Sequence, residues 1–206
     1  MMRPGSPRRS NRAIASRLFI VGAGGLGRTV LQFVHDAASS AERIRAAGFL
    51  DDNLDSLAGY ARDVAVVGTL AAHRPRRTDL HLIAVADPAV RERLAALAAE
   101  RGARFHTLVH PSACVAPTAR LGAGCVIAPF AFVGPDAVLG DHVFVHAHAF
   151  IDHDVRVGPF SYLGPHAVVC GFANLGASVR VGPRAAVGAK RVLECGTAVG
   201  PGEALL

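Results

Sequence analysis

A branched aliphatic residue recurs at every sixth position from Val115 to Val199, fifteen times in succession. Helices and strands have periods of 3.6 and 2 residues, so a strict repeat of six indicates a repeat architecture. Gly often follows the aliphatic residue, which suits a chain that turns there. Three strands and three turns then form one coil of 18 residues, so the pattern predicts a parallel β-helix of five coils. At a strand spacing of ~4.8 Å it would be roughly 24 Å tall. The aliphatic positions are Val115, Leu121, Ile127, Val133, Leu139, Val145, Ile151, Val157, Leu163, Val169, Leu175, Val181, Val187, Leu193 and Val199.

Each hexad also predicts which side chains point inward. The aliphatic residue and the mostly small residue two positions before it should point into the β-helix, and the residue between them outward. Outward residues one coil apart share a face. The apolar face predicts a buried interface between copies of the chain, and hence a homo-oligomer. That face consists of Cys114, Phe132, Phe150, Val168 and Ala186; a second has Arg120, Val138, Arg156, Asn174 and Val192; the third has Val126, Phe144, Tyr162, Arg180 and Ala198.

The part of the chain before these hexads alternates β-runs with helical segments. A helix should follow Asp87, because Asp87 suits the N-cap, Pro88 the first position and Gly102 the end. Alternating strands and helices predict a small Rossmann-like parallel α/β domain over residues 17–110, followed by the β-helix over 111–206. The β-runs are Arg17–Val21, Ala47–Leu50, Val64–Val67, Leu82–Ala86 and Phe105–Val109, and the first helical segment is Arg28–Ala38.

Composition excludes several classes of protein. The net charge of +6 comes mostly from five arginines within residues 1–17, so we interpret residues 1–16 as a disordered basic arm and expect no nucleic-acid partner. No segment approaches the ~20 apolar residues that would span a membrane. The four cysteines contain no CxxC pair, which predicts neither a zinc finger nor a disulfide framework. A cytoplasmic protein is expected.

A glycine-rich segment follows the first β-run and precedes the first helical segment. Backbone N–H groups at such a helix start can hold a diphosphate. Taken alone, the motif indicates a dinucleotide oxidoreductase. A domain of about 95 residues is too small for the full two-halved fold, so a nucleotide-sugar fits better, while a turn that only packs the helix on the sheet stays open. The candidate substrate-binding residues are Gly22, Gly24, Gly25, Leu26 and Gly27, with Asp51 and Asp52 at the end of the second β-run.

The segment Leu108–Ala113, LVHPSA, joins the α/β domain directly to the first hexad. Together with the stretch Ile151–Gly158, IDHDVRVG, this order resembles the hexapeptide-repeat sugar acetyltransferases of the PglD/NeuD type over about residues 17–190. These are nucleotide-sugar N-acetyltransferases and sialic acid O-acetyltransferases. The resemblance implies a left-handed β-helix, a homotrimer and acetyl-CoA as donor. It also implies His153 as general base and Asp154 as the carboxylate that orients it.

The hexads themselves favour the same residues. His153 stands two positions after Ile151, on the corner next to the apolar face, and it must point outward because the inward positions are filled. Flanked by Asp152 and Asp154, it is suited to act as a base near neutral pH. One coil later the same position is Gly171, whose N–H could hold the oxyanion formed from a thioester.

The resemblance further implies acetyl-CoA contacts at Tyr162, Gly171 and Pro183. The family usually carries histidines at the positions of Leu26 and Tyr162, so both residues are departures that bear on acceptor identity and donor positioning. His106 and His110, at the joint between the domains, are expected to be structural.

Two other functions remain open. A zinc hydro-lyase of the γ-carbonic anhydrase kind uses the same β-helix, and His148 and His153 have a suitable spacing of five. That family also needs a His where this chain has Ser112, so no metal is predicted. A scaffold that has lost activity is the other alternative, because of Leu26 and Tyr162. The acceptor sugar, and whether its amino or hydroxyl group is acetylated, are not specified by the sequence.

Overall fold

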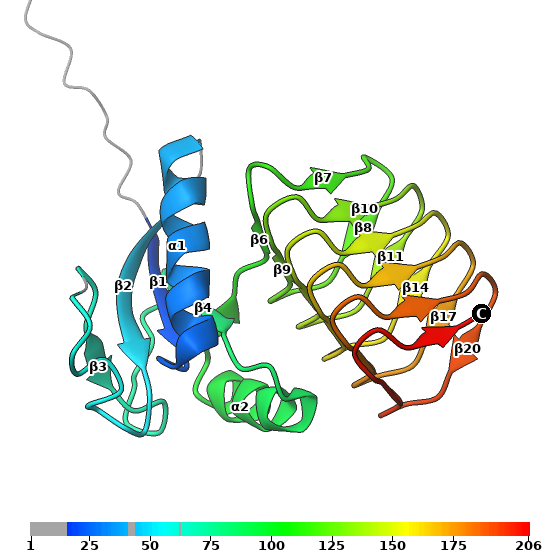
Figure 1. The fold of residues 1–206 in the computed structure, drawn as a ribbon. Helices are drawn as coiled ribbons and strands as arrows, with labels where there is room; N and C mark the ends of the chain where they lie inside the picture. The colour runs from blue at the N-terminus through cyan, green and yellow to red at the C-terminus, as the bar shows by residue number, and fades with distance from the viewer. Residues whose placement is uncertain (1–15, 41–43, 62) are drawn as a thin grey trace, which may run out of the picture.

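The chain folds into an α/β domain followed by a three-sided solenoid, as the sequence predicts (Figure 1). The computed structural model describes residues 16–40, 44–61 and 63–206. The predicted basic arm lies outside the described residues, except for Ser16, the first residue of β1.

The α/β domain is built on a five-stranded parallel sheet with the order β3-β2-β1-β4-β5. Leu18 and Ile20 of β1 pack in the core that contains α1, whereas Phe19 and Val21 pack in the core that contains α2. The helices therefore cover opposite faces of the sheet. The elements are β1 (Ser16–Val21), α1 (Gly25–Ser40), β2 (Ile44–Leu50), β3 (Val66–Gly68), β4 (Leu80–Ile83), α2 (Pro88–Glu100) and β5 (Arg104–Phe105).

Helix α2 begins where the sequence predicts. The side chain of Asp87 accepts a hydrogen bond from the N–H of Val90, and Pro88 occupies the first turn. This cap satisfies one N–H group that a helix start leaves without an intrahelical partner.

The solenoid is a left-handed β-helix of two-residue strands that form three parallel sheets. We call the sheet beside the α/β domain the domain-facing sheet, the one with the apolar outer face the apolar sheet, and the last the third sheet. The domain-facing sheet contains β6 (Leu108–Val109), β9 (Val126–Ile127), β12 (Phe144–Val145), β15 (Tyr162–Leu163), β18 (Arg180–Val181) and β21 (Ala198–Val199). The apolar sheet contains β7 (Cys114–Val115), β10 (Phe132–Val133), β13 (Phe150–Ile151), β16 (Val168–Val169), β19 (Ala186–Val187) and β22 (Ala204–Leu205). The third sheet contains β8 (Arg120–Leu121), β11 (Val138–Leu139), β14 (Arg156–Val157), β17 (Asn174–Leu175) and β20 (Val192–Leu193).

The predicted register of the hexads is confirmed. Residues 18 positions apart pair in neighbouring strands, as Phe132 does with Phe150. The inward aliphatic residues and the small residues before them form one buried cluster along the solenoid. The corners add a feature that the hexads did not predict: eleven residues other than glycine have a left-handed backbone there, with φ between 56° and 62°.

The β-run Phe105–Val109, which the sequence presents as one strand, is divided between the two domains. Phe105 ends β5 in the α/β sheet, whereas Leu108 begins β6, which pairs with β9 of the solenoid. The solenoid therefore starts before the predicted boundary at residue 110, and only His106 and Thr107 separate the two strands.

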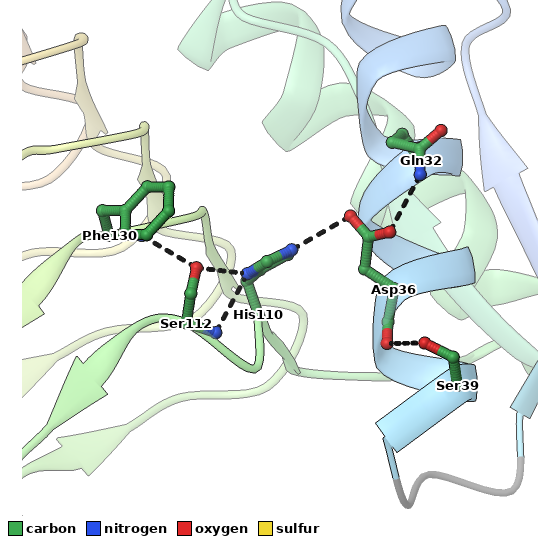
Figure 2. A network of polar contacts seen from close by, with 6 residues as sticks. All are labelled: Gln32, Asp36, Ser39, His110, Ser112 and Phe130. Carbon is green, nitrogen blue, oxygen red and sulfur yellow. Dashed lines mark hydrogen bonds and ion pairs between the residues drawn. The ribbon is translucent and has the colours of Figure 1, made fainter.

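A polar network ties α1 to the first coil (Figure 2). Nδ1 of His110 accepts the N–H of Ser112 at 3.1 Å and lies 2.8 Å from Ser112 Oγ. Nε2 of His110 is 3.1 Å from Oδ2 of Asp36, and this hydrogen bond holds the pKa of Asp36 below its usual value. Because Nδ1 is an acceptor here, Nε2 carries the proton that Asp36 accepts. Ser112 Oγ also accepts the N–H of Phe130 in the next coil, so LVHPSA connects the domains.

Arg91 of α2 is buried where the two domains meet. Its guanidinium donates to the carbonyl oxygens of Val85 and Ala86 in its own domain. It also donates to His142 O at 3.0 Å, to Phe160 O and to Ser161 O in the solenoid. Burial lowers the pKa of Arg91 to about 10, so the group stays charged at neutral pH. Charge-assisted bonds to buried carbonyls are stronger than neutral ones, so Arg91 fixes α2 to the solenoid.

Candidate active site

The corner Asp152–Val155, which joins β13 to β14, presents the histidine singled out in the sequence. We call it the His153 corner. The N–H of His153 donates to Oδ1 of Asp152 at 2.8 Å, and the N–H of Asp154 donates to Pro135 O in the preceding coil at 2.9 Å. The backbone of this turn is therefore held on both sides. Ile151 and Val155 are buried in the solenoid, so the imidazole points outward.

His153 and Asp154 form a hydrogen-bonded pair. Nδ1 of His153 lies 2.9 Å from Oδ2 of Asp154, and both side chains remain partly exposed. The hydrogen bond to Asp154 raises the pKa of His153 above its ordinary value. A carboxylate only accepts hydrogen bonds, so Nδ1 carries the proton and the neutral imidazole keeps its lone pair on Nε2. The pair is thus arranged to take up a proton at Nε2.

Gly171 lies against that same edge of the imidazole. A Cβ at position 171 would stand 2.8 Å from Cε1 and 2.9 Å from Nε2 of His153. Among the residues that the structure describes, the N–H of Gly171 and Nε2 of His153 have no hydrogen-bond partner. A proton acceptor and a free backbone donor therefore stand side by side, an arrangement that suits attack on a carbonyl group and stabilisation of the resulting oxyanion.

Tyr162 and Pro183 lie elsewhere on the same chain. Both line a groove of about 230 Å³ along the domain-facing sheet, together with Arg180 and Pro201. Burial raises the pKa of Tyr162. Gly171 instead lies beside His153, one coil after the His153 corner, so one chain does not bring the three predicted acetyl-CoA contacts together.

In the glycine loop of the α/β domain, two positions cannot accept a side chain and two have space for one. A Cβ at Gly27 would stand 2.0 Å from Gly22 O, and Gly22 itself has a φ of +98°. These two glycines are required by the packing of α1 on the sheet. Gly24 and Gly25 are exposed, and a Cβ there would meet no atom within 4 Å, so a ligand can approach. Leu26 is half-buried and packs against the core on the α1 side.

The two aspartates after β2 have different surroundings. Oδ2 of Asp51 accepts the N–H of Ala23 at 2.7 Å, and Oδ1 accepts the N–H of Asn53 at 2.9 Å. Asp51 therefore holds the glycine loop in place. Asp52 is exposed and, with Gly22 and Arg93, lines a hollow of about 180 Å³ where β1, β2 and β4 end. The strand order reverses at β1, and parallel α/β sheets generally bind ligands at that point.

The apolar sheet presents its outer face to solvent in the single chain. The rings of Phe132 and Phe150 stack with centroids 4.8 Å apart and planes 9° apart, and Phe150 is 39% exposed. The His153 corner continues directly from this face, because β13 contains Phe150 and ends at Ile151.

Sequence reasoning missed three residues that shape these regions. Arg91 carries no sequence signal of its burial, because charged residues are common on exposed helix faces. Asp36 is far from His110 in sequence, so their contact could not be predicted without the three-dimensional structure. Phe172, whose ring packs against His153, could have been found by adding 18 to Asp154 in the hexad register.

Within residues 16–40, 44–61 and 63–206, no three His, Cys, Asp or Glu side chains are grouped as ligands for one metal ion. No helix in this part of the chain is long and apolar enough to cross a membrane.

Comparison with known proteins shows what the chain is similar to. Residues 17–97 match the model of the PglD N-terminal domain. PerB from Caulobacter crescentus, solved with CoA and GDP-perosamine, is 26% identical with a TM-score of 0.83, over 92% of this chain and 88% of PerB. The acetyltransferase domain of PglB from Neisseria gonorrhoeae is 28% identical with a TM-score of 0.84, over 93% of this chain and 91% of that domain. A second structure of that domain, with acetyl coenzyme A, is 26% identical with a TM-score of 0.71, over 91% of this chain and 97% of the other.

No curated protein sequence matches the chain. The match of the α/β domain, the likeness of the whole chain to these acetyltransferases and the fifteen hexads agree. The chain is an acyltransferase with hexapeptide repeats, and its α/β domain matches the PglD N-terminal domain over residues 17–97.

Proposed function

We propose that the protein transfers an acetyl group from acetyl-CoA to an amino group of a nucleotide-activated sugar, in the cytoplasm. The observation that carries this proposal is the contact of His153 with both Asp154 and Gly171. PerB supports the choice of ligands, because its structure holds CoA and GDP-perosamine. A hydroxyl acceptor, as on a sialic acid, would use the same groups.

The chemistry follows from the positions of these groups. The acceptor nitrogen attacks the thioester carbonyl carbon while Nε2 of His153 takes its proton, and Asp154 stabilises the imidazolium that forms. The carbonyl oxygen becomes an oxyanion that the N–H of Gly171 holds. The C–S bond then breaks, and the CoA thiolate takes the proton from the imidazolium. The products are the N-acetyl sugar and CoA, and His153 is neutral again.

The α/β domain would hold the nucleotide part of the acceptor. The N–H groups at the start of α1, around Gly24 and Gly25, suit a diphosphate, because a helix N-terminus carries partial positive charge. The hollow beside Asp52 is open to a ribose or base. Asp51 acts indirectly, by fixing the loop through Ala23.

The donor site would be completed by a second copy of the chain. Tyr162 and Pro183 line a groove on the domain-facing sheet, away from Gly171 and His153. In a homotrimer joined along the apolar sheet, the groove of one copy would lie beside the His153 corner of the next. The stacked rings of Phe132 and Phe150, with Phe150 39% exposed in the single chain, support such an assembly.

The proposal is tested by measuring CoA release from acetyl-CoA in the presence of UDP- and GDP-linked amino sugars. Matched sugars that carry a hydroxyl in place of the amine separate N- from O-acetylation, and mass spectrometry identifies the product. We expect turnover with an amino sugar in its nucleotide-linked form and much less with the free sugar. Absence of acetylated product from every acceptor would overturn the proposal.

A further inference from the structure

An exposed aromatic ring lies beside the proposed base. Phe172 is 53% exposed, and its ring centroid lies 5.1 Å from that of the His153 imidazole, with the two planes 86° apart. The N–H of Phe172 donates to His153 O at 3.2 Å. The ring is thus held at the surface beside the imidazole, not in the core of the solenoid.

The fold does not call for an aromatic side chain at this position. Phe172 has a φ of +61°, in the left-handed region that bulky residues rarely occupy. The residues one coil before and one coil after it, Asp154 and Lys190, are both charged. A polar residue or glycine would therefore satisfy the corner, and the presence of Phe needs another reason.

Two other phenylalanines at left-handed corners provide a comparison. Phe130 stacks on His148 with planes 18° apart, and Phe160 stacks on His142 with planes 7° apart. Each of these pairs is separated by 18 residues, so the repeat itself places one ring over the other. Phe172 and His153 are 19 residues apart and nearly perpendicular. Their contact is specific to the His153 corner.

The position of Phe172 relative to the reacting atoms suggests its role. An acyl carbonyl between Nε2 of His153 and the N–H of Gly171 would lie next to the residue that follows Gly171 in the chain. If Gly171 holds the carbonyl oxygen and the attacking nitrogen lies beside His153, the carbon chain of the acyl group would extend toward the apolar ring of Phe172. The methyl group of an acetyl donor would make an apolar contact with the ring, whereas a longer acyl chain would collide with it.

We propose that Phe172 is a specificity-determining residue that closes the acyl pocket and restricts the donor to short acyl groups. This inference rests on the proposed acyl transfer at His153 and Gly171. It adds a selection among acyl-CoA donors that the chemistry of the base and the oxyanion donor does not provide.

The test compares Phe172→Ala with Phe130→Ala, which removes a similarly exposed phenylalanine with a left-handed backbone from another corner. The kcat/KM values for acetyl-, propionyl-, butyryl- and hexanoyl-CoA are measured with one acceptor. A methylene group in an apolar pocket changes specificity by roughly 10–200-fold. We therefore expect Phe172→Ala to raise the butyryl-to-acetyl ratio by at least about 10-fold, and Phe130→Ala to leave it unchanged.

Calorimetric titration of acetyl-CoA and butyryl-CoA into the parent protein and the two variants gives a second readout that needs no acceptor. Relative binding of butyryl-CoA should improve only in Phe172→Ala. An unchanged ratio in that variant would overturn the inference, whether or not its elution on sizing shifts, because Phe172 would then only pack against another copy. An equal change in Phe130→Ala would also overturn it. Absence of turnover with every donor, alongside a changed binding ratio, would count against the proposed function and not against the pocket.

Discussion

Asp154 reaches the imidazole of its own neighbour, His153, from a left-handed backbone with a φ of +57°. Successive side chains in an extended strand point to opposite sides, so adjacent residues there do not meet. At this corner the turn places both side chains outside the solenoid, with Nδ1 and Oδ2 2.9 Å apart.

Asp154→Asn should shift the pH dependence of catalysis. The hydrogen bond to Asp154 raises the pKa of His153, and the proposed base would work only when neutral, so activity should fall as the pH drops through that raised pKa. Removing the carboxylate lowers the pKa of His153 toward its ordinary value. The acidic limb of the kcat/KM profile should therefore move to lower pH. If the acidic limb of the profile did not move, the ionisation that controls activity would belong to a group other than His153.

His153→Ala should lower turnover by roughly 10²–10⁴-fold, the usual cost of losing a general base. The oligomer should remain intact, because the side chain lies outside the core. His166→Ala is the matched control, since His166 is also an exposed corner histidine but stacks on His148. Near wild-type turnover in His153→Ala, measured as CoA release, would remove His153 from the mechanism.

Gly171→Ala should reduce kcat while leaving the fold stable. The new Cβ would stand 2.9 Å from Nε2 of His153, and an exposed imidazole on a turn can swing aside. A displacement of about 1 Å can cost on the order of 10²-fold in rate. Cys170→Ala, at the adjacent residue, serves as control. Similar kcat values for the two variants, with the same melting temperature, would argue against a role for the Gly171 contact.

Replacing both Phe132 and Phe150 with Asp should give monomers or aggregates on sizing. Burying the part of each ring that the single chain leaves exposed should contribute roughly 1–2 kcal/mol. Val192→Asp is the control, because Val192 is 64% exposed on the third sheet. A double variant that elutes as the parent oligomer would exclude the apolar sheet as the interface.

Gly24→Val should weaken acceptor binding and leave acetyl-CoA binding unchanged, as measured by calorimetric titration. A Cβ at Gly24 meets no atom of the protein, so the variant should fold while its side chain blocks the approach of a diphosphate. Gly27→Ala should instead fail to fold, since its Cβ would collide with Gly22 O. Tight NAD binding by the parent protein, lost in Gly24→Val, would favour an oxidoreductase.

The sequence predicted the features that depend on local pattern. The strict hexads specify the register of the solenoid, so they place Phe132 beside Phe150 and Gly171 beside His153. The cap at Asp87 is equally local. Contacts between the domains depend on how separate elements pack against each other, and the spacing of residues within one element does not predict that packing. The burial of Arg91, the division of Phe105–Val109 and the use of Asp51 within its own loop were therefore not predicted.

The short joint at His106 and Thr107 has a kinetic consequence. Two residues of connection, with Arg91 bonded to both sides, make the α/β domain and the solenoid a single rigid body. Binding of one substrate therefore does not require a movement of the domains before the other substrate can bind. Donor and acceptor should accordingly bind in random order, so each should bind to the protein in the absence of the other. The radius of gyration in solution should stay the same when both sites are saturated.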